Sequence, residues 1–264
     1  MIPYFQVNQL IFGPITIQVW GLLVATGIII GVNFGRKLCR KLVLSEDVFF
    51  DVAIWVLISA MIFARVFHVV FYNFPFFEAH PEEILKFWHG GESSLGSFFG
   101  AILAVCLFLY KRKFKLKEFW PYLDIMSMSF WLGLGIGRLG CFIIHDHIGI
   151  KSDFFLAIRF PGASRLDLGL IESLLGFALF AVFYKLFDKL IKKRFGLVTI
   201  YSWLAYSVVR FFTDFLRAKD IVDSDIRYAH LTPAQWGMVG VILALTALLF
   251  SDRIRQVFKK RDNL

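Results

Sequence analysis

The sequence predicts an all-α, polytopic integral membrane protein with seven transmembrane helices, an outward-facing N-terminus and a cytoplasmic C-terminus. The first observation is composition: 58% of the 264 residues are hydrophobic and only 19% are charged, whereas soluble domains contain about 25% charged residues. The second is that apolar stretches close to the roughly 20 residues that span a hydrocarbon core recur along the whole chain. This composition excludes a disordered chain and disfavours a soluble enzyme.

Seven apolar stretches predict the helices in order. Three of them carry no charge, at residues 13–35, 93–110 and 231–251. The other four contain few ionisable residues, at 48–70, 119–137, 168–186 and 197–215. We expect no cleaved signal peptide in the first stretch, because its basic residues follow it rather than precede it.

Basic residues predict the orientation. Nineteen of the 29 Lys and Arg lie on alternating connections, at 36–41, 111–117, 185–194 and 253–261. By the positive-inside rule, these connections are cytoplasmic. The net charge of +9 is therefore a topological signal with attraction to anionic lipids, and no nucleic acid partner is expected.

One domain over residues 1–264 is the simplest organisation, because the sequence has no repeat and no linker. The predicted outer connections, at 72–91, 138–167 and 217–232, are longer and more polar than the inner ones, so we expect the chemistry there. Three cysteines give no disulfide framework, and four metal ligands at a suitable spacing are absent. We therefore expect no metal and no cofactor.

Charged residues at membrane depth are the sharper clue to a site. Such residues are Arg65, Arg138, Arg210, Asp214 and Arg217; each is costly in hydrocarbon unless it has a partner or lines a wet cavity. The last three are spaced i, i+4 and i+7, which predicts one shared helix face. The planar guanidinium of arginine matches the geometry of a phosphate, so these residues favour binding of an anionic phospholipid headgroup. We expect Asp214 to orient Arg210 and Arg217. The alternative is snorkelling side chains and structural ion pairs.

Two glycine-rich segments accompany these charges. Residues 133–140 contain Gly at every second position up to Gly137, then Arg138 and Gly140, in a membrane helix rather than after a strand. The dinucleotide fingerprint therefore fails, and small residues instead allow close helix packing. Residues 90–100 open another helix, where serine capping and a helix N-terminus favour an anion.

The motifs resemble those of the bacterial prolipoprotein diacylglyceryl transferases over nearly the whole chain. Three segments carry the resemblance: residues 137–142, residues 71–75 followed by 88–91, and residues 210–217 followed by Gln235. Trp20-Gly21 and Glu172 fall at further family positions. The sequence departs from the family at Leu95, where members often carry a candidate catalytic histidine. It also departs at Cys141, where members often carry Asn, and at Asp146, where they often carry Glu. We expect Cys141 to be structural.

The resemblance implies transfer of the diacylglyceryl group of phosphatidylglycerol to the lipobox cysteine of prolipoproteins, at the bacterial inner (plasma) membrane, by a monomer without metal or cofactor. Residues assigned to catalysis are Arg138, Arg210, Asp214, His145, Asp146 and His147, the last three as candidate bases. Residues assigned to phosphatidylglycerol are Arg138, Arg210, Arg217, Arg65, Tyr72, Asn73, Ser93, Ser94, Gly96, Gly140 and Gln235.

Three alternatives stay open. The chain could be a secondary transporter of an organic or phosphorylated anion, although seven helices do not divide into two equal repeats. It could also be another phospholipid headgroup transferase. With Leu95 in place of the histidine, the field of the arginines could lower the thiol pKa without any dedicated base.

Overall fold

The structure, a computed structural model, describes residues 1–86, 90–221 and 227–261, with side chains described as far as Phe250. The family-like pair Trp88-His89 lies outside the described residues. The chain forms two compact units, one of residues 1–31 and 127–264 and the other of residues 32–126. Helices α1 (Val19–Lys41) and α5 (Leu116–Ile144) each contribute to both units. The expected single domain stays a prediction.

The predicted polytopic helical membrane protein is confirmed. Five expected helices correspond to α2 (Glu46–Phe71), α4 (Ser94–Arg112), α6 (Leu168–Lys193), α7 (Leu197–Thr213) and α8 (Pro233–Arg261). Among the described residues, six helices are long and apolar enough to cross a membrane: α1, α2, α4, α5, α6 and the 233–250 part of α8. At 17 residues, α7 is not among them, so the count of seven and the orientation remain predictions.

The boundaries of the first and fourth expected helices are wrong. Residues 13–18 belong to a β-hairpin, β2 (Gln9–Phe12) and β3 (Ile15–Gln18), and the first helix begins only at Val19. Helix α5 continues seven residues past 137 to Ile144, so Arg138 and Cys141 lie inside a helix rather than in a loop. Within this extension, Gly140 lets α5 approach α1 closely: a Cβ there would stand 3.1 Å from the Cα of Trp20.

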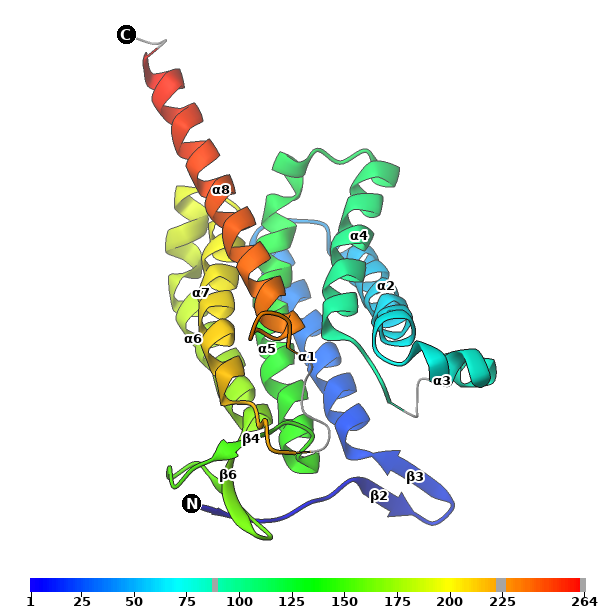
Figure 1. Ribbon diagram of the computed structural model, residues 1–264. Coiled ribbons are helices and arrows are strands. Elements are labelled where there is room, and N and C mark those ends of the chain that lie inside the picture. The colour runs from blue at the N-terminus through cyan, green and yellow to red at the C-terminus, as the bar shows by residue number, and fades with distance from the viewer. Residues whose placement is uncertain (87–89, 222–226, 262–264) are drawn as a thin grey trace. The chain divides into compact units, whose positions relative to one another are not determined.

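Short strands, which the all-α prediction lacked, form a small sheet in the first unit. Strands β1 (Ile2–Pro3), β4 (Ile148–Lys151), β5 (Ile158–Phe160) and β6 (Ala163–Asp167) pair in the order β1-β5-β6-β4. Figure 1 shows β4 and β6 at the end of the unit where α6 begins and α7 ends. The sheet also holds the chain after α7, because the Ala218 amide donates to the Ile148 carbonyl at 3.2 Å. This hydrogen bond joins the segment that follows α7 to the start of β4.

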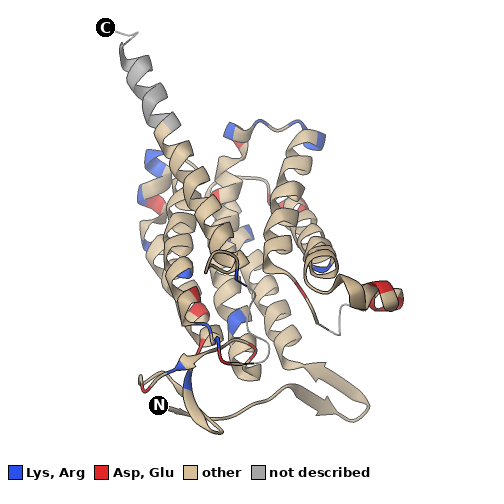
Figure 2. Cartoon of the chain, in the orientation of Figure 1, with Lys and Arg blue, Asp and Glu red and all other residues tan. Residues whose placement is uncertain are grey.

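In the second unit, α2 packs against α4 through glycines. A Cβ on Gly96 would stand 2.3 Å from the carbonyl oxygen of Phe63, and one on Gly100 would stand 2.5 Å from that of Ser59. Two short helices, α3 (Phe74–Ala79) and η1 (Pro81–Leu85), follow α2. Figure 2 shows basic residues at the connection from α4 to α5 in this unit and, in the first unit, at the C-terminal end of α6.

Candidate active site

Three residues at the end of α7 and directly after it form the first part of the site. Arg210 lies in the last turn of α7, Asp214 opens the short helix η3 (Asp214–Leu216), and Arg217 follows it. Oδ1 of Asp214 lies 2.7 Å from Nη1 of Arg210 and 2.8 Å from Nε of Arg217. The structure thus brings together the three residues that the i, i+4, i+7 spacing placed on one face, with the fully buried Asp214 between the two arginines.

Glu172 of α6 connects this group to α5. Its Oε2 lies 2.8 Å from Nε of Arg138, and its Oε1 lies 3.4 Å from Nη1 of Arg210. These are ion-pair distances, but among the described residues neither Glu172 oxygen has a hydrogen bond of good geometry, and neither does Nη1 of Arg210. Buried polar groups with unused bonding capacity are typical of a site that takes a polar ligand.

The buried cluster carries an excess of positive charge. We call Arg138, Glu172, Arg210, Asp214 and Arg217 the arginine cluster. Its three guanidiniums stand against two carboxylates, so these five residues carry a formal excess of one positive charge. The side chains of Arg138 and Arg217 retain 19% and 18% exposure, against 6% for Arg210. An anion would therefore be recognised chiefly by the two more accessible guanidiniums.

Thr232 and Gln235 fix Asp214 from the start of α8. The hydroxyl of Thr232 donates to Oδ2 of Asp214. The Gln235 side chain accepts from the Thr232 amide at 2.9 Å and donates to the Phe211 carbonyl at 3.0 Å. Gln235, expected to contact substrate, thus joins α8 to α7 through its amide nitrogen, while its amide oxygen caps the start of α8.

His145 is held on both sides of its ring. Nδ1 lies 2.7 Å from Oδ2 of Asp167, and Nε2 contacts the Phe5 carbonyl oxygen. The residue is buried in a left-handed backbone conformation, with φ +54°. Burial raises the pKa of Asp167, while the bond to His145 opposes that rise. The ring therefore joins the N-terminal segment to the start of α6.

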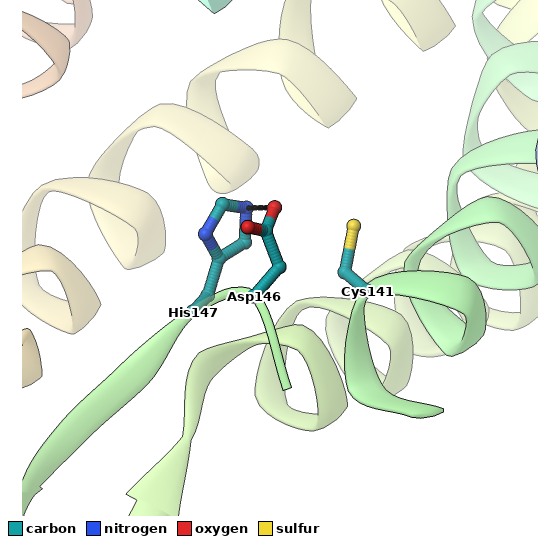
Figure 3. A group of neighbouring side chains, drawn as sticks. All are labelled: Cys141, Asp146 and His147. Carbon is teal, nitrogen blue, oxygen red and sulfur yellow. Dashed lines mark ion pairs between the residues drawn. The ribbon is translucent and has the colours of Figure 1, made fainter. Parts of the chain in front are cut away.

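His147 lies beside the arginine cluster. Burial, followed by the nearby charges of Arg138 and Arg217, lowers the pKa of His147 to about 4. Asp146 is exposed, and Cys141 is buried with its Sγ 3.6 Å from Nη1 of Arg138. Figure 3 shows the side chains of Cys141, Asp146 and His147 converging at the end of α5.

Six expected substrate residues lie in the second unit. The buried Arg65 donates to backbone carbonyls of the connection after α3, among them those of Ile84 at 3.0 Å and Glu83 at 2.6 Å. Ser93 caps α4 by accepting from the Gly96 amide at 3.3 Å. Tyr72, Asn73 and Ser94 are exposed. Arg65, Ser93 and Gly96 each have a structural task, and the substrate contacts of all six remain predictions.

Two residues of the site escaped the assignment from sequence. Glu172 was noted only as a family position, yet it is the one acid in the expected helix 168–186, a signal that its cost in a membrane makes strong. Thr232 gave no such signal, because a threonine before a helix is most often only a cap.

Comparisons with known proteins identify relatives of this chain. A model of the family described as prolipoprotein diacylglyceryl transferase matches residues 7–251. A phosphatidylglycerol–prolipoprotein diacylglyceryl transferase of Trichormus variabilis is 31% identical over 250 residues, covering 89% of this chain and 86% of the relative. Those of Finegoldia magna and Bacillus velezensis are 30% and 27% identical; the first alignment covers 89% of this chain and 92% of the relative, and the second 92% of each. The chain therefore belongs to the prolipoprotein diacylglyceryl transferase family.

Proposed function

We propose that this chain transfers the diacylglyceryl group of phosphatidylglycerol to the lipobox cysteine thiol of prolipoproteins in the bacterial plasma membrane. The family match over most of the chain and the names of its relatives support this activity. The membrane-spanning helices suit a lipid substrate. Neither an anion transporter nor another headgroup transferase has comparable support.

The excess positive charge of the arginine cluster is the observation that carries the proposal. Glu172 and Asp214 hold three guanidiniums in place. The partly exposed Arg138 and Arg217 can donate hydrogen bonds to the phosphate diester. Because the carboxylates are buried and tied to several partners, the donors keep their positions before the lipid arrives. Preorganised donors of this kind stabilise charge that develops in a transition state.

The reaction asks two things of the protein. A thiolate sulfur displaces the phosphate oxygen from the glyceryl carbon, so a C–S bond forms, a C–O bond breaks and glycerol phosphate leaves. The departing phosphate gains negative charge, which Arg138 and Arg217 neutralise together with the more buried Arg210. The acceptor thiol, whose pKa is ordinarily about 8.5, must also lose its proton.

The three candidate bases differ in how well they suit that second task. Both ring nitrogens of His145 are already engaged with oxygens. His147 is neutral at neutral pH, but a pKa of about 4 makes it a weak proton acceptor. Asp146 is exposed and has the accessibility that a base needs. We therefore favour a structural role for His145. Asp146 and His147 remain the candidates for accepting the proton of the lipobox thiol.

The same proposal includes the topology. Seven helices, an outer N-terminus and a cytoplasmic C-terminus would place the cluster toward the outer leaflet, where prolipoproteins present their lipobox. A single domain acting as a monomer completes the proposal.

Lipid analysis with a lipobox peptide tests the function. The purified protein in vesicles of phosphatidylglycerol is incubated with the peptide and, as a control, with a peptide whose cysteine is serine. We expect one glycerol phosphate released per lipidated cysteine peptide and none with the control. Uptake of an organic anion into the vesicles without lipidation would instead favour a transporter.

A further inference from the structure

A pocket of about 550 Å³ lies at the C-terminal end of α4, where the chain turns toward α5. Its lining residues are Leu109, Tyr110, Lys111, Lys113 and Phe114. The pocket shares no residue with the arginine cluster, and none of its residues was assigned to phosphatidylglycerol from the sequence. The proposed transfer reaction therefore does not account for it.

The backbone around the pocket is held in a defined helix end. Lys113 adopts a left-handed conformation, with φ +55°, and the Phe114 amide donates to the Leu109 carbonyl at 3.0 Å. These two features close α4 in a Schellman motif. The Phe114 ring centroid lies 6.3 Å from that of the buried Phe108 and 5.9 Å from that of the buried Phe119. Because its turn is packed against buried rings, the pocket is formed before any ligand arrives.

Two lysine side chains make the pocket positively charged. Between them in the sequence, Arg112 is compensated, because its Nη2 lies 2.5 Å from Oδ2 of Asp51. In the part of the chain that the structure describes, neither Lys111 nor Lys113 has a carboxylate at ion-pair distance. Nζ of Lys111 lies 5.1 Å from the ring centroid of Trp55, a cation–π contact that leaves its charge uncompensated. The pocket therefore favours an anion.

An exposed stripe of α4 leads to the pocket from the membrane interior. Ile102, Cys106 and Tyr110 are spaced i, i+4 and i+8, so they share one helix face. All three are exposed, Ile102 at 64% and Tyr110 at 83%. Since α4 is long and apolar enough to cross a membrane, this face contacts acyl chains in a bilayer, and the Tyr110 ring suits the level of the headgroups. A lipid can use both the stripe and the lysines, whereas a soluble anion can use only the lysines.

We propose that the pocket binds the phosphate of an anionic phospholipid through Lys111 and Lys113, with the acyl chains along the exposed face of α4. The connection 111–117 carries five basic residues and no acid, as Figure 2 allows the reader to follow. The positive-inside rule predicts that it faces the cytoplasmic leaflet, where anionic lipids attract such segments. The lipid is bound and not consumed, so this inference does not depend on the proposed transfer reaction.

Binding is tested with phosphatidic acid, an anionic phospholipid that is not the proposed substrate. The protein is placed in phosphatidylcholine vesicles that contain a small fraction of phosphatidic acid with brominated acyl chains, which quench nearby tryptophans. Trp55 reports on the pocket because its ring lies 5.1 Å from Nζ of Lys111, and its emission is the difference between wild type and Trp55→Phe. We expect Trp55 to be quenched at a lower fraction of brominated phosphatidic acid than of brominated phosphatidylcholine. Equal quenching by the two lipids would overturn the proposal.

Charge-matched variants separate the pocket from the rest of the basic connection. Lys111→Gln and Lys113→Gln should each weaken binding of phosphatidic acid about fivefold, the factor that corresponds to about 1 kcal/mol per lysine. Lys115→Gln and Lys117→Gln remove the same charge outside the pocket lining and should leave binding unchanged. All four side chains are exposed, so we expect every variant to unfold near the wild-type temperature. An equal loss in all four variants would show a general attraction to basic residues and overturn the pocket as a site.

Soluble glycerol phosphate distinguishes a lipid from a free anion. It offers a phosphate but no acyl chains, so it lacks the apolar contact with α4 that favours the lipid. We expect glycerol phosphate at millimolar concentration to leave the quenching of Trp55 by brominated phosphatidic acid unchanged. Release of the quenching by glycerol phosphate would overturn the assignment of the pocket to a phospholipid.

Discussion

Arg138 and Glu172 form the ion pair that connects two helices at the candidate active site, with Nε and Oε2 2.8 Å apart. Arg138 lies in α5 and Glu172 in α6. Because Glu172 also lies 3.4 Å from Arg210 of α7, one buried carboxylate sets the position of two arginines. The accessible guanidinium of Arg138 is therefore aimed by a residue that need not touch the substrate.

Glu172→Gln should abolish transfer and also destabilise the protein. The change leaves two buried guanidiniums short of a counter-charge, and breaking a buried pair costs about 3–5 kcal/mol. Transfer assays and thermal unfolding in detergent would measure both effects. Glu78→Gln, at an exposed acid in α3, is the control and should change neither. Normal transfer by Glu172→Gln would show that the carboxylate does not position the arginines.

Arg138→Ala should reduce transfer strongly while the protein still inserts, and Arg138→Lys should also be poor. A lysine keeps the charge but loses the planar fork that matches a phosphate, and loss of a buried charge-assisted contact costs about 2–5 kcal/mol. The measurement is complementation of a transferase-deficient strain together with the initial rate. Arg159→Lys, at an exposed position of β5, should behave as the wild type. Full complementation by Arg138→Ala would contradict the phosphate assignment.

The sequence predicts the helices well because hydropathy is a local property. It also predicts the grouping of Arg210, Asp214 and Arg217, since a helical spacing fixes which residues share a face. The contact of Arg138 with Glu172 was out of reach, because the register between α5 and α6 depends on packing. In the same way, the charge of Arg65 at membrane depth predicts that the residue has a partner. Only the path of the chain after α3 shows that its partners include backbone carbonyls.

Thr232→Val should raise the KM for phosphatidylglycerol more than it lowers kcat. The change removes the hydroxyl that donates to Asp214, and leaving a buried acceptor short of a partner costs about 1–3 kcal/mol. Thr232→Ser keeps the hydroxyl and should restore the wild-type KM. Thr26→Val is a matched control, because the hydroxyl of Thr26 donates to the Leu22 carbonyl within its own helix, α1. An equal loss in Thr232→Ser and Thr232→Val would point to packing rather than to the hydrogen bond.

The pair of Arg165 and Asp220 should make stability depend on pH in the acidic range. The hydrogen bonds from Arg165 lower the pKa of Asp220 from 3.8 to about 2. A carboxyl with a depressed folded-state pKa adds stability above its unfolded pKa, and that stability is lost as pH falls through about 2. Asp220→Asn should therefore unfold at a lower temperature than wild type at pH 6, with the difference shrinking between pH 4 and pH 2.

Thermal unfolding across this range checks the sign. The exposed Asp153 gives a control, Asp153→Asn, whose difference from wild type should stay small throughout. A difference for Asp220→Asn that grows on acidification would contradict the assignment.

His145→Asn should loosen the N-terminal segment and leave the chemical step largely intact. Asparagine tolerates the left-handed backbone at this position, where φ is +54°, but it is too short to reproduce both bonds of the ring, to Asp167 and to the Phe5 carbonyl. Hydrogen exchange of residues 1–8 should accelerate, and unfolding should require about 1–3 kcal/mol less. The rate per folded molecule should stay near that of wild type, and His80→Asn should change neither quantity. If exchange of residues 1–8 is unchanged while the rate falls sharply, His145 takes part in the reaction, and the structural role assigned to its two bonds is wrong.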